Sequence, residues 1–336
     1  MSGDLPLILA IDVGTSTVKG ALVDGDGRIR TISTERVLDH PRAVSVWDGD
    51  RRHGAIAQVL REIGPLAAVD VVVVSGHGPT LVPIDADGSA LEPVLLWNDG
   101  RERRVSGQPS FFLPKAAWLA AERPDVYERT RYFLSLPEYV DYLLTGEVVT
   151  ISPTDEFTPY IWDAESIAAY GLDADRFPPF VHTGEQIGEV QAASAERYGL
   201  PAGTPVVAGG SDFLMSLVGT ASLAPGRTCD RAGTSEGINY CASTPVTDPR
   251  LRTLPHVRAG MYNIAAILES TGSAFEWFRV ITGQQDKGYV HILEDIRSAA
   301  TDAPLFVPSP RGLDGWNFEN GAFLELNSHH GPAELG

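Results

Sequence analysis

A carboxylate, a glycine and a run of hydroxyl residues follow one another near the start of the chain. Asp12 ends an apolar stretch and is followed by Gly14, Thr15, Ser16 and Thr17. A turn of this composition can present backbone N–H groups in a concave nest that suits phosphate oxygens. Asp12 would then lie where its carboxylate can hold Mg²⁺, directly or through water. The same residues also suit a hairpin whose aspartate and threonine side chains bond their own backbone.

A second turn of the same kind occurs much later in the chain. Gly233, Thr234 and Ser235 lie between two β-like runs. Two such turns on two lobes could hold one nucleotide from opposite sides of a cleft, and this repetition favours a phosphate site at both. Neither turn has the Gly-Lys-Ser/Thr ending of a P-loop, and no Gly-x-Gly-x-x-Gly fingerprint follows the first strand. P-loop and Rossmann nucleotide sites are therefore disfavoured.

A third group consists of two glycines, a serine and an aspartate, from Gly209 to Asp212. The glycines allow close backbone approach, and Asp212 comes at the start of a helical pattern. Its carboxylate could accept the proton of an attacking hydroxyl, as the base does in phosphoryl-transfer sites. The positive end of the helix dipole would keep it ionised. Aspartate is also among the best helix N-cap residues, so a purely structural role fits the same pattern.

Regular elements must position these groups, and the hydrophobic pattern predicts an α/β chain. An apolar strand over 7–13 and a second over 18–23, followed by two Asp-Gly pairs, predict a hairpin. Apolar residues at helical spacing predict a helix within 51–66. The uninterrupted apolar run 71–74 is typical of a strand that is covered on both faces. Strand, helix and strand therefore alternate.

The rest of the chain continues this alternation with one interruption. Residues 111–144 carry mostly helical signals and predict a helical insertion. A short buried strand is expected at 205–208, followed by a helix over 212–221. Strand-rich sequence begins at Cys229.

Turn residues at 224–226 separate two patterns of sequence and predict a domain boundary. We expect a first domain over 1–224 and a second over 225–336. A chain of 336 residues, of which 43% are hydrophobic, can bury two cores of this size.

Charge and cysteine content exclude several classes of protein. A net charge of −18 argues against nucleic-acid and membrane partners, because phosphate backbones and anionic lipids would be repelled. The two cysteines, Cys229 and Cys241, are too few for a disulfide framework or a zinc knuckle. The apolar run at the start lacks the basic n-region and cleavage site of a signal peptide, and no run is long enough to span a bilayer. We expect a soluble cytoplasmic protein.

The chain resembles the FGGY family of carbohydrate kinases, and the likeness rests on ordered motifs. Two of them are Leu95-Leu96-Trp97-Asn98-Asp99-Gly100-Arg101 and Asp141-Tyr142-Leu143-Leu144-Thr145-Gly146-Glu147, which are similar to segments of xylulokinase-like members. The others resemble the family's first phosphate motif, its catalytic-aspartate motif and its second phosphate loop, at 12–15, 209–212 and 233–235. The resemblance covers nearly the whole chain.

What the resemblance implies is ATP-dependent phosphorylation of a small sugar or polyol, with a ketopentose of the xylulose kind as the nearest class. It implies an α/β, ribonuclease H-like/actin-like ATPase fold of two lobes with a cleft between them and an incomplete second lobe. The first domain, 1–224, would carry the sugar-binding and catalytic groups, and the second, 225–336, would be a partial nucleotide-binding domain. Mg²⁺ and ATP would serve as cofactor and co-substrate. Asp212 would be the general base, and Asp12 would serve the metal and the reacting phosphoryl group; both are candidate metal ligands. Phosphate contacts would come from Gly14, Thr15, Ser16, Gly233, Thr234 and Ser235, and substrate contacts from His77, Trp97, Asn98, Asp99, Arg101 and Asp212.

Two departures from the family pattern bear on these expectations. Gly78 and Pro79 stand where family members place side chains that contact the substrate, so no particular sugar carries over, and His77 suits a turn as well as a sugar contact. Family members also normally continue well beyond the region that ends here at Gly336. This early end is compatible with three interpretations: a fragment, a degenerate kinase, or one part of a split enzyme. A homodimer could complete the second lobe.

Two other classes of protein are alternatives to an active kinase. Gly233-Thr234-Ser235-Glu236-Gly237 matches the Gly-x-Ser-x-Gly elbow of α/β-hydrolases, with His256, His291, His329 and His330 downstream. The elbow requires a helix after the serine, whereas the sequence that follows is β-like, which disfavours a hydrolase. A pseudokinase that binds a sugar or a partner without phosphorylating it is the other alternative.

Overall fold

The computed structural model describes residues 5–37, 49–233, 236–268, 271–299, 303–307 and 321–336. The chain divides into two compact units. Unit 1 comprises Met1–Leu223 and Pro255–Met261, and unit 2 comprises Ala224–Leu254 and Tyr262–Gly336.

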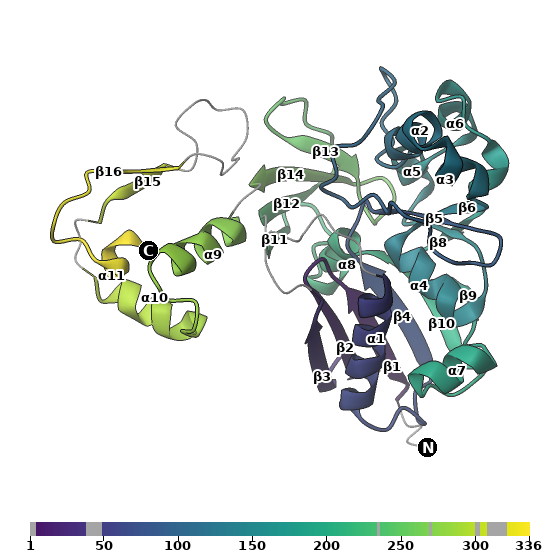
Figure 1. Ribbon diagram of the computed structural model, residues 1–336, viewed down its shortest axis with the longest axis horizontal. Helices are drawn as coiled ribbons and strands as arrows, with labels where there is room; N and C mark the ends of the chain where they lie inside the picture. The colour runs from purple at the N-terminus through teal and green to yellow at the C-terminus, as the bar shows by residue number, and fades with distance from the viewer. Residues whose placement is uncertain (1–4, 38–48, 234–235, 269–270, 300–302, 308–320) are drawn as a thin grey trace. The chain divides into compact units, whose positions relative to one another are not determined.

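Unit 1 is built on a mixed sheet with the strand order β3-β2-β1-β4-β10-β9 (Figure 1). Strands β1, β4 and β10 run parallel to one another, while β2, β3 and β9 pair antiparallel with their neighbours. The bounds are β1 Leu7–Val13, β2 Thr17–Asp24, β3 Ile29–Arg36, β4 Val71–Gly76, β9 Gln186–Glu189 and β10 Pro205–Ser211.

Helix α1 (Gly49–Ile63) packs against the antiparallel strands β2 and β3 of this sheet. Its buried positions Ile56, Val59 and Ile63 recur every three or four residues, which is the spacing that places side chains on one face of a helix. A Cβ atom at Gly20 of β2 would lie 2.6 Å from both Ile63 Cδ1 and Val59 Cγ1. A glycine at this position therefore allows the helix to approach the sheet closely.

Helix α4 (Leu136–Thr145) contacts β4, β9 and β10 on the parallel side of the sheet. It begins with a capping box, in which the Glu138 side chain accepts the backbone N–H of Ser135, and it ends at Gly146 in a left-handed conformation. Together, α1 and α4 bury the alternating apolar residues of the central strands, such as Leu9, Val72 and Val206. This core gives rigid support to the strand ends.

The remaining elements of unit 1 lie between β4 and β9, between β9 and β10, and after β10 in the chain. Several short strands pair outside the main sheet, β5 with β6 and β7 with β8. The bounds are β5 Leu81–Ile84, α2 Leu113–Glu122, α3 Pro124–Arg129, β6 Tyr132–Ser135, β7 Thr150–Ser152, the 3₁₀ turn Asp155–Phe157, α5 Thr158–Ile161, α6 Ala164–Ala169, the 3₁₀ turn Ala174–Arg176, β8 Phe180–His182, α7 Ala192–Tyr198 and α8 Asp212–Gly219.

Unit 2 contains a four-stranded sheet of order β11-β12-β14-β13 within the described residues. Its helices and a separate two-stranded ribbon follow in the chain. The bounds are β11 Thr228–Ala232, β12 Glu236–Ala242, β13 Arg252–Pro255, β14 Tyr262–Leu268, α9 Thr271–Ile281, α10 Tyr289–Arg297, β15 Leu305–Val307, β16 Ala322–Leu324 and α11 Pro332–Leu335.

The strand arrangement of unit 2 contradicts the hydrolase alternative. The segment after the Gly-x-Ser-x-Gly match forms β12, which pairs antiparallel with β11 and β14. A nucleophile elbow requires a helix at this point, because the serine must be presented on a strand-to-helix turn. The match is therefore a coincidence of sequence.

The predicted elements correspond to the structure apart from shifts of one or two residues at some ends and two larger differences. The predicted helical insertion over 111–144 contains the strand β6 between α3 and α4. Strand β10 also continues through Gly209 and Gly210 to Ser211, whereas the prediction ended it at Ala208. Both differences have the same cause, because pairing partners far away in the chain stabilise strands that local sequence does not favour. In the part of the chain that is described, no helix has the length and apolar character needed to cross a membrane.

Candidate active site

Three parallel strands of unit 1 end at one edge of the sheet and bring candidate residues together there. Asp12 of β1 pairs with Ser75 of β4, and Gly76 of β4 pairs with Ser211 of β10. Asp212 comes directly after Ser211. Since neighbouring strands lie about 4.8 Å apart, the backbones that carry the two aspartates are separated by about 10 Å. Ligands of open α/β sheets bind beyond the carboxyl ends of the strands, so this edge is the place for a site.

Asp12 is held by neighbours on both sides. Ser75 Oγ donates a hydrogen bond to Asp12 Oδ1 at 2.9 Å, and Lys19 Nζ lies 3.6 Å from Asp12 Oδ2. The Asp12 side chain keeps 33% of its surface exposed. A partly exposed carboxylate at a strand end fits a hard cation that takes its remaining ligands from phosphate and water. Among the described residues no group of three or more metal-ligating side chains occurs, so phosphate and water would have to complete the shell.

The turn after β1 has the tight geometry expected of a phosphate turn. Gly14 donates its backbone N–H to Thr17 O at 2.9 Å. A Cβ atom at position 14 would lie 2.9 Å from the same oxygen, so a glycine is required there. Ser16 O accepts the backbone N–H of Val37 at 3.0 Å.

Two side chains from other elements bind this turn. The buried guanidinium of Arg52, on α1, donates to Gly14 O at 2.8 Å and to Thr15 O at 3.1 Å. Trp97 Nε1 donates to Thr15 Oγ1 at 3.0 Å, although the two residues are 82 positions apart in sequence. The segment predicted to border the sugar therefore contacts the segment predicted to bind phosphate.

An irregular pairing of strand β10 with β4 sets the position of Asp212, which directly follows β10. Its register against β4 shifts between Val207 and Gly210, and Gly210 has a φ of +130°. A Cβ atom at Gly209 would lie only 2.0 Å from Val74 O, so the backbones of the two strands touch. Asp212 is the first residue of α8 after Ser211 at the N-cap position, and its Oδ1 accepts the backbone N–H of Phe213 at 2.6 Å. Its carboxylate therefore lies at the positive end of the helix, where ionisation is favoured.

His77 lies directly after β4, deep in unit 1. Only 3% of its surface is exposed, and its backbone N–H donates to Val13 O at 3.0 Å. Its Nδ1 is 2.8 Å from Thr80 Oγ1, while Nε2 has no hydrogen-bond partner among the described residues. Burial, followed by the nearby charges of Arg52 and Lys115, lowers the pKa of His77 from 6.5 to about 3. The imidazole is therefore neutral near pH 7.

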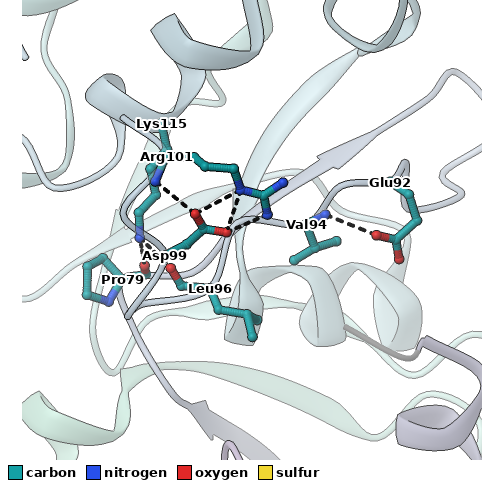
Figure 2. A network of polar contacts seen from close by, with 7 residues as sticks. All are labelled: Pro79, Glu92, Val94, Leu96, Asp99, Arg101 and Lys115. Carbon is teal, nitrogen blue, oxygen red and sulfur yellow. Dashed lines mark hydrogen bonds and ion pairs between the residues drawn. The ribbon is translucent and has the colours of Figure 1, made fainter. Parts of the chain in front are cut away.

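A buried lysine joins the loop after β4 to the segment before Trp97 (Figure 2). Lys115 of α2 is 2% exposed, and its Nζ donates to Pro79 O at 2.8 Å and to Leu96 O at 2.6 Å. Burial lowers the pKa of Lys115 to about 8, against the opposing effect of the Asp99 charge. This ammonium thus holds two loops of the candidate site at a fixed separation.

Asp99 and Arg101 bind each other. The Arg101 guanidinium donates from Nε at 2.9 Å and from Nη2 at 2.5 Å to the two Asp99 oxygens, and it lies 5.1 Å from the centre of the Trp118 ring (Figure 2). Burial by itself would raise the pKa of Asp99, but the hydrogen bonds and charge of Arg101 outweigh it and lower the pKa. Asn98, which precedes Asp99, is exposed. These contacts stabilise the segment, and direct contact of the three residues with a substrate stays a prediction.

The second predicted phosphate turn belongs to unit 2. Gly233 follows β11, while Thr234 and Ser235 lie outside the described residues. The antiparallel pair on either side of the turn agrees with the predicted run of strand, turn and strand. Phosphate contacts from this turn stay a prediction.

Arg52 and Lys115 were missed from the sequence, although a signal for each exists. Arg52 falls in step with the buried face of α1 that carries Ile56 and Val59. Lys115 likewise lies one helical turn before the buried Leu119. A long cationic side chain on an apolar helix face is a marker of a buried polar contact, because burying a charge without partners is costly.

Comparisons with known proteins agree with this arrangement. The model of the N-terminal domain of the FGGY family of carbohydrate kinases matches residues 101–219. Autoinducer-2 kinase from Escherichia coli (strain K12) is 34% identical over 313 residues, an alignment that covers 81% of this chain and 58% of the relative. The chain therefore spans about 58% of the length of this curated relative.

Solved structures of sugar kinases share the fold. Xylulose kinase from Rhodospirillum rubrum matches 98% of this chain and 75% of its own, with a TM-score of 0.74 at 21% identity. Gluconate kinase from Lactobacillus acidophilus matches 98% of this chain and 74% of its own, with a TM-score of 0.76 at 20% identity. These likenesses confirm the predicted α/β, ribonuclease H-like/actin-like ATPase fold.

Proposed function

Since the chain belongs to the FGGY family of carbohydrate kinases, we propose that it transfers the γ-phosphoryl group of ATP to an alcohol group of a small polyhydroxylated substrate. The observation that carries the proposal is the meeting of Asp12, the turn after β1 and Asp212 at one edge of the sheet. Phosphoryl transfer requires an acceptor base, phosphate donors and a site for a divalent cation. Unit 1 supplies a candidate for each.

In this proposal Asp212 is the general base. Its carboxylate accepts the proton of the substrate hydroxyl as the oxygen of that hydroxyl attacks the γ-phosphorus. Its place at the start of α8 favours the ionised form that this role needs.

Asp12, together with Asp212, would hold Mg²⁺. The metal would offset negative charge on the phosphates when bound. The hydrogen bond from Ser75 and the nearby Lys19 keep the Asp12 carboxylate in place. The backbone N–H groups of Thr15 and Ser16, and the turn at Gly233–Ser235, would bind phosphate oxygens.

Two features of the site support a neutral, polyhydroxylated acceptor. His77 is an uncharged imidazole whose buried Nε2 has no partner among the described residues, so one hydroxyl or carbonyl group that reaches it would satisfy it. Trp97 offers a half-buried aromatic ring beside the turn. Because the curated relatives are named as kinases of autoinducer-2, that compound joins the ketopentoses as a substrate to test.

The test is a coupled assay of ADP release with Mg-ATP and a panel of ketopentoses, ketohexoses, polyols and autoinducer-2. Asp212→Asn removes the base but keeps the shape of the side chain, and it should reduce turnover by at least about 10²-fold while substrate binding persists. The matched control is Asp125→Asn, which changes an exposed carboxylate of α3 that is paired with Arg123. Turnover that is equal in both variants would remove Asp212 from the mechanism, and ATP binding without turnover on any acceptor would favour a pseudokinase.

A further inference from the structure

Arg52 has an unusual position for a charged residue. It lies in the first turns of α1 with only 3% of its surface exposed. Its two terminal nitrogens donate to the consecutive main-chain oxygens Gly14 O and Thr15 O, at 2.8 and 3.1 Å. Arginine remains protonated in proteins, so a full positive charge is buried directly behind the turn.

The geometry of the peptide bond gives this contact a consequence. In a planar trans peptide, the C=O of one residue and the N–H of the next point in opposite directions. When Arg52 fixes the oxygens of Gly14 and Thr15 on its own side, the N–H groups of Thr15 and Ser16 are turned to the opposite side. Neither N–H has a hydrogen-bond acceptor among the described residues. Two adjacent donors are thus directed away from the protein backbone that surrounds Arg52.

The hydroxyl group of Thr15 is a third donor on this turn, and a side chain from another segment holds its oxygen. Its oxygen accepts the Trp97 indole N–H at 3.0 Å, and within the described part of the chain it donates to no other group. The hydroxyl proton of Thr15 is therefore available to an acceptor. Together with the two N–H groups it makes three donors on one short turn, which matches the acceptor-rich surface of a phosphate group.

From this geometry we propose that Arg52 is a positioning residue, which orients the N–H groups of Thr15 and Ser16 toward a phosphate group of the bound nucleotide. The inference rests on the proposed kinase function and adds a residue from outside the turn to it. Arg52 touches neither substrate nor nucleotide. It acts through the two carbonyl groups that its guanidinium binds.

The test compares steady-state kinetics of Arg52→Ala and Arg52→Lys with those of the control Arg61→Ala. Arg61 is exposed on the same helix and bonds Gln58. Loss of oriented donors should reduce kcat/KM for Mg-ATP by about 10²-fold in Arg52→Ala, because misplacement by about 1 Å costs that much. A lysine can reach one carbonyl at a time, so Arg52→Lys should show a smaller loss. Free guanidinium ion should restore part of the activity of the alanine variant, whereas Arg61→Ala should behave as the wild type.

A readout independent of turnover separates this inference from the proposed function. Addition of Mg-ATP should shift the ¹⁵N–¹H resonances of Thr15 and Ser16 in the wild type, and it should shift them much less in Arg52→Lys at equal saturation. An inactive wild type that shows these shifts would contradict the kinase proposal but support the role of Arg52. Wild-type resonances that do not respond, or activity lost only in proportion to a lowered unfolding temperature and not restored by guanidinium, would overturn the inference.

Discussion

His77 illustrates how burial sets the chemistry of a single residue. Burial and two neighbouring cations lower the pKa of His77 from 6.5 to about 3, and Thr80 binds its Nδ1 at 2.8 Å. In the unfolded chain the same imidazole would take up a proton near pH 6.5. The folded state therefore binds fewer protons than the unfolded state between about pH 6.5 and pH 3.

We predict that His77 is a source of acid sensitivity. Its contribution to the free energy of unfolding is present above pH 6.5 and is lost as the pH falls toward 3; the full interval corresponds to about 5 kcal/mol. His77→Asn keeps a polar group that can form a hydrogen bond with Thr80 but cannot be protonated. Urea unfolding at several pH values should show a smaller loss of stability between pH 7 and pH 4 in the variant. Parallel pH curves for the two proteins would contradict this.

At the scale of residues, the sequence predicted some parts of the site better than others. Asp12 and Asp212 could be found because each follows an apolar strand beside glycines, and the structure places both at the same edge of the sheet. Their catalytic roles stay predictions. Arg52 and Lys115 could not be assigned because their acceptors are main-chain oxygens, which every residue carries. The pairing of Asp99 with Arg101 likewise appears only in three dimensions.

At the scale of elements, the contact between β4 and β10 is the feature on which the site depends most. The register shift at Gly210 and the direct approach of Gly209 to Val74 O set the direction in which Asp212 leaves the sheet. The sequence placed the end of this strand before the two glycines. Glycine disfavours strands in general, so the bulge could be recognised only once its partner strand was known.

Gly209→Ala should be strongly destabilising. The new Cβ atom would lie 2.0 Å from a backbone oxygen of the neighbouring strand, and neither strand can move without breaking pairs. We expect a loss of about 3 kcal/mol or more in the free energy of unfolding, measured with urea. The control is Gly54→Ala on α1, where nothing lies within 4 Å of the new atom and a gain of about 0.5–1 kcal/mol is expected. A small effect at Gly209 would mean that β10 adjusts freely.

At the scale of the whole molecule, composition and alternation of elements predicted the α/β class, and structural likeness confirmed the actin-like fold. The substrate could not be predicted in the same way. It depends on how a few side chains around His77 and Trp97 meet a ligand, and the loop at Gly78 and Pro79 departs from the family's pattern. The proposed boundary between the two domains also stays a prediction.

The charge of the whole chain leads to a further prediction. A net charge of −18 produces self-repulsion that favours the unfolded state, and salt screens it over a distance of about 10 Å at 0.1 M. Raising NaCl from 0.01 to 0.3 M at pH 8 should therefore increase the unfolding temperature by a few degrees, measured by calorimetry. Near pH 4.8, the isoelectric point of the sequence, the same addition should have little effect. Equal responses at both pH values would show that repulsion is not the cause.

The hydrogen bond between Trp97 and Thr15 also has a spectroscopic consequence. Indole emission depends on the polarity and hydrogen bonding around its N–H group, and here that group contacts the turn proposed to bind phosphate. Of the six tryptophans in the chain, Trp162 by contrast is almost completely buried, with 1% of its surface exposed. Trp97 thus makes the turn a natural fluorescent reporter, in which the arrival of a nucleotide could be followed without any added dye.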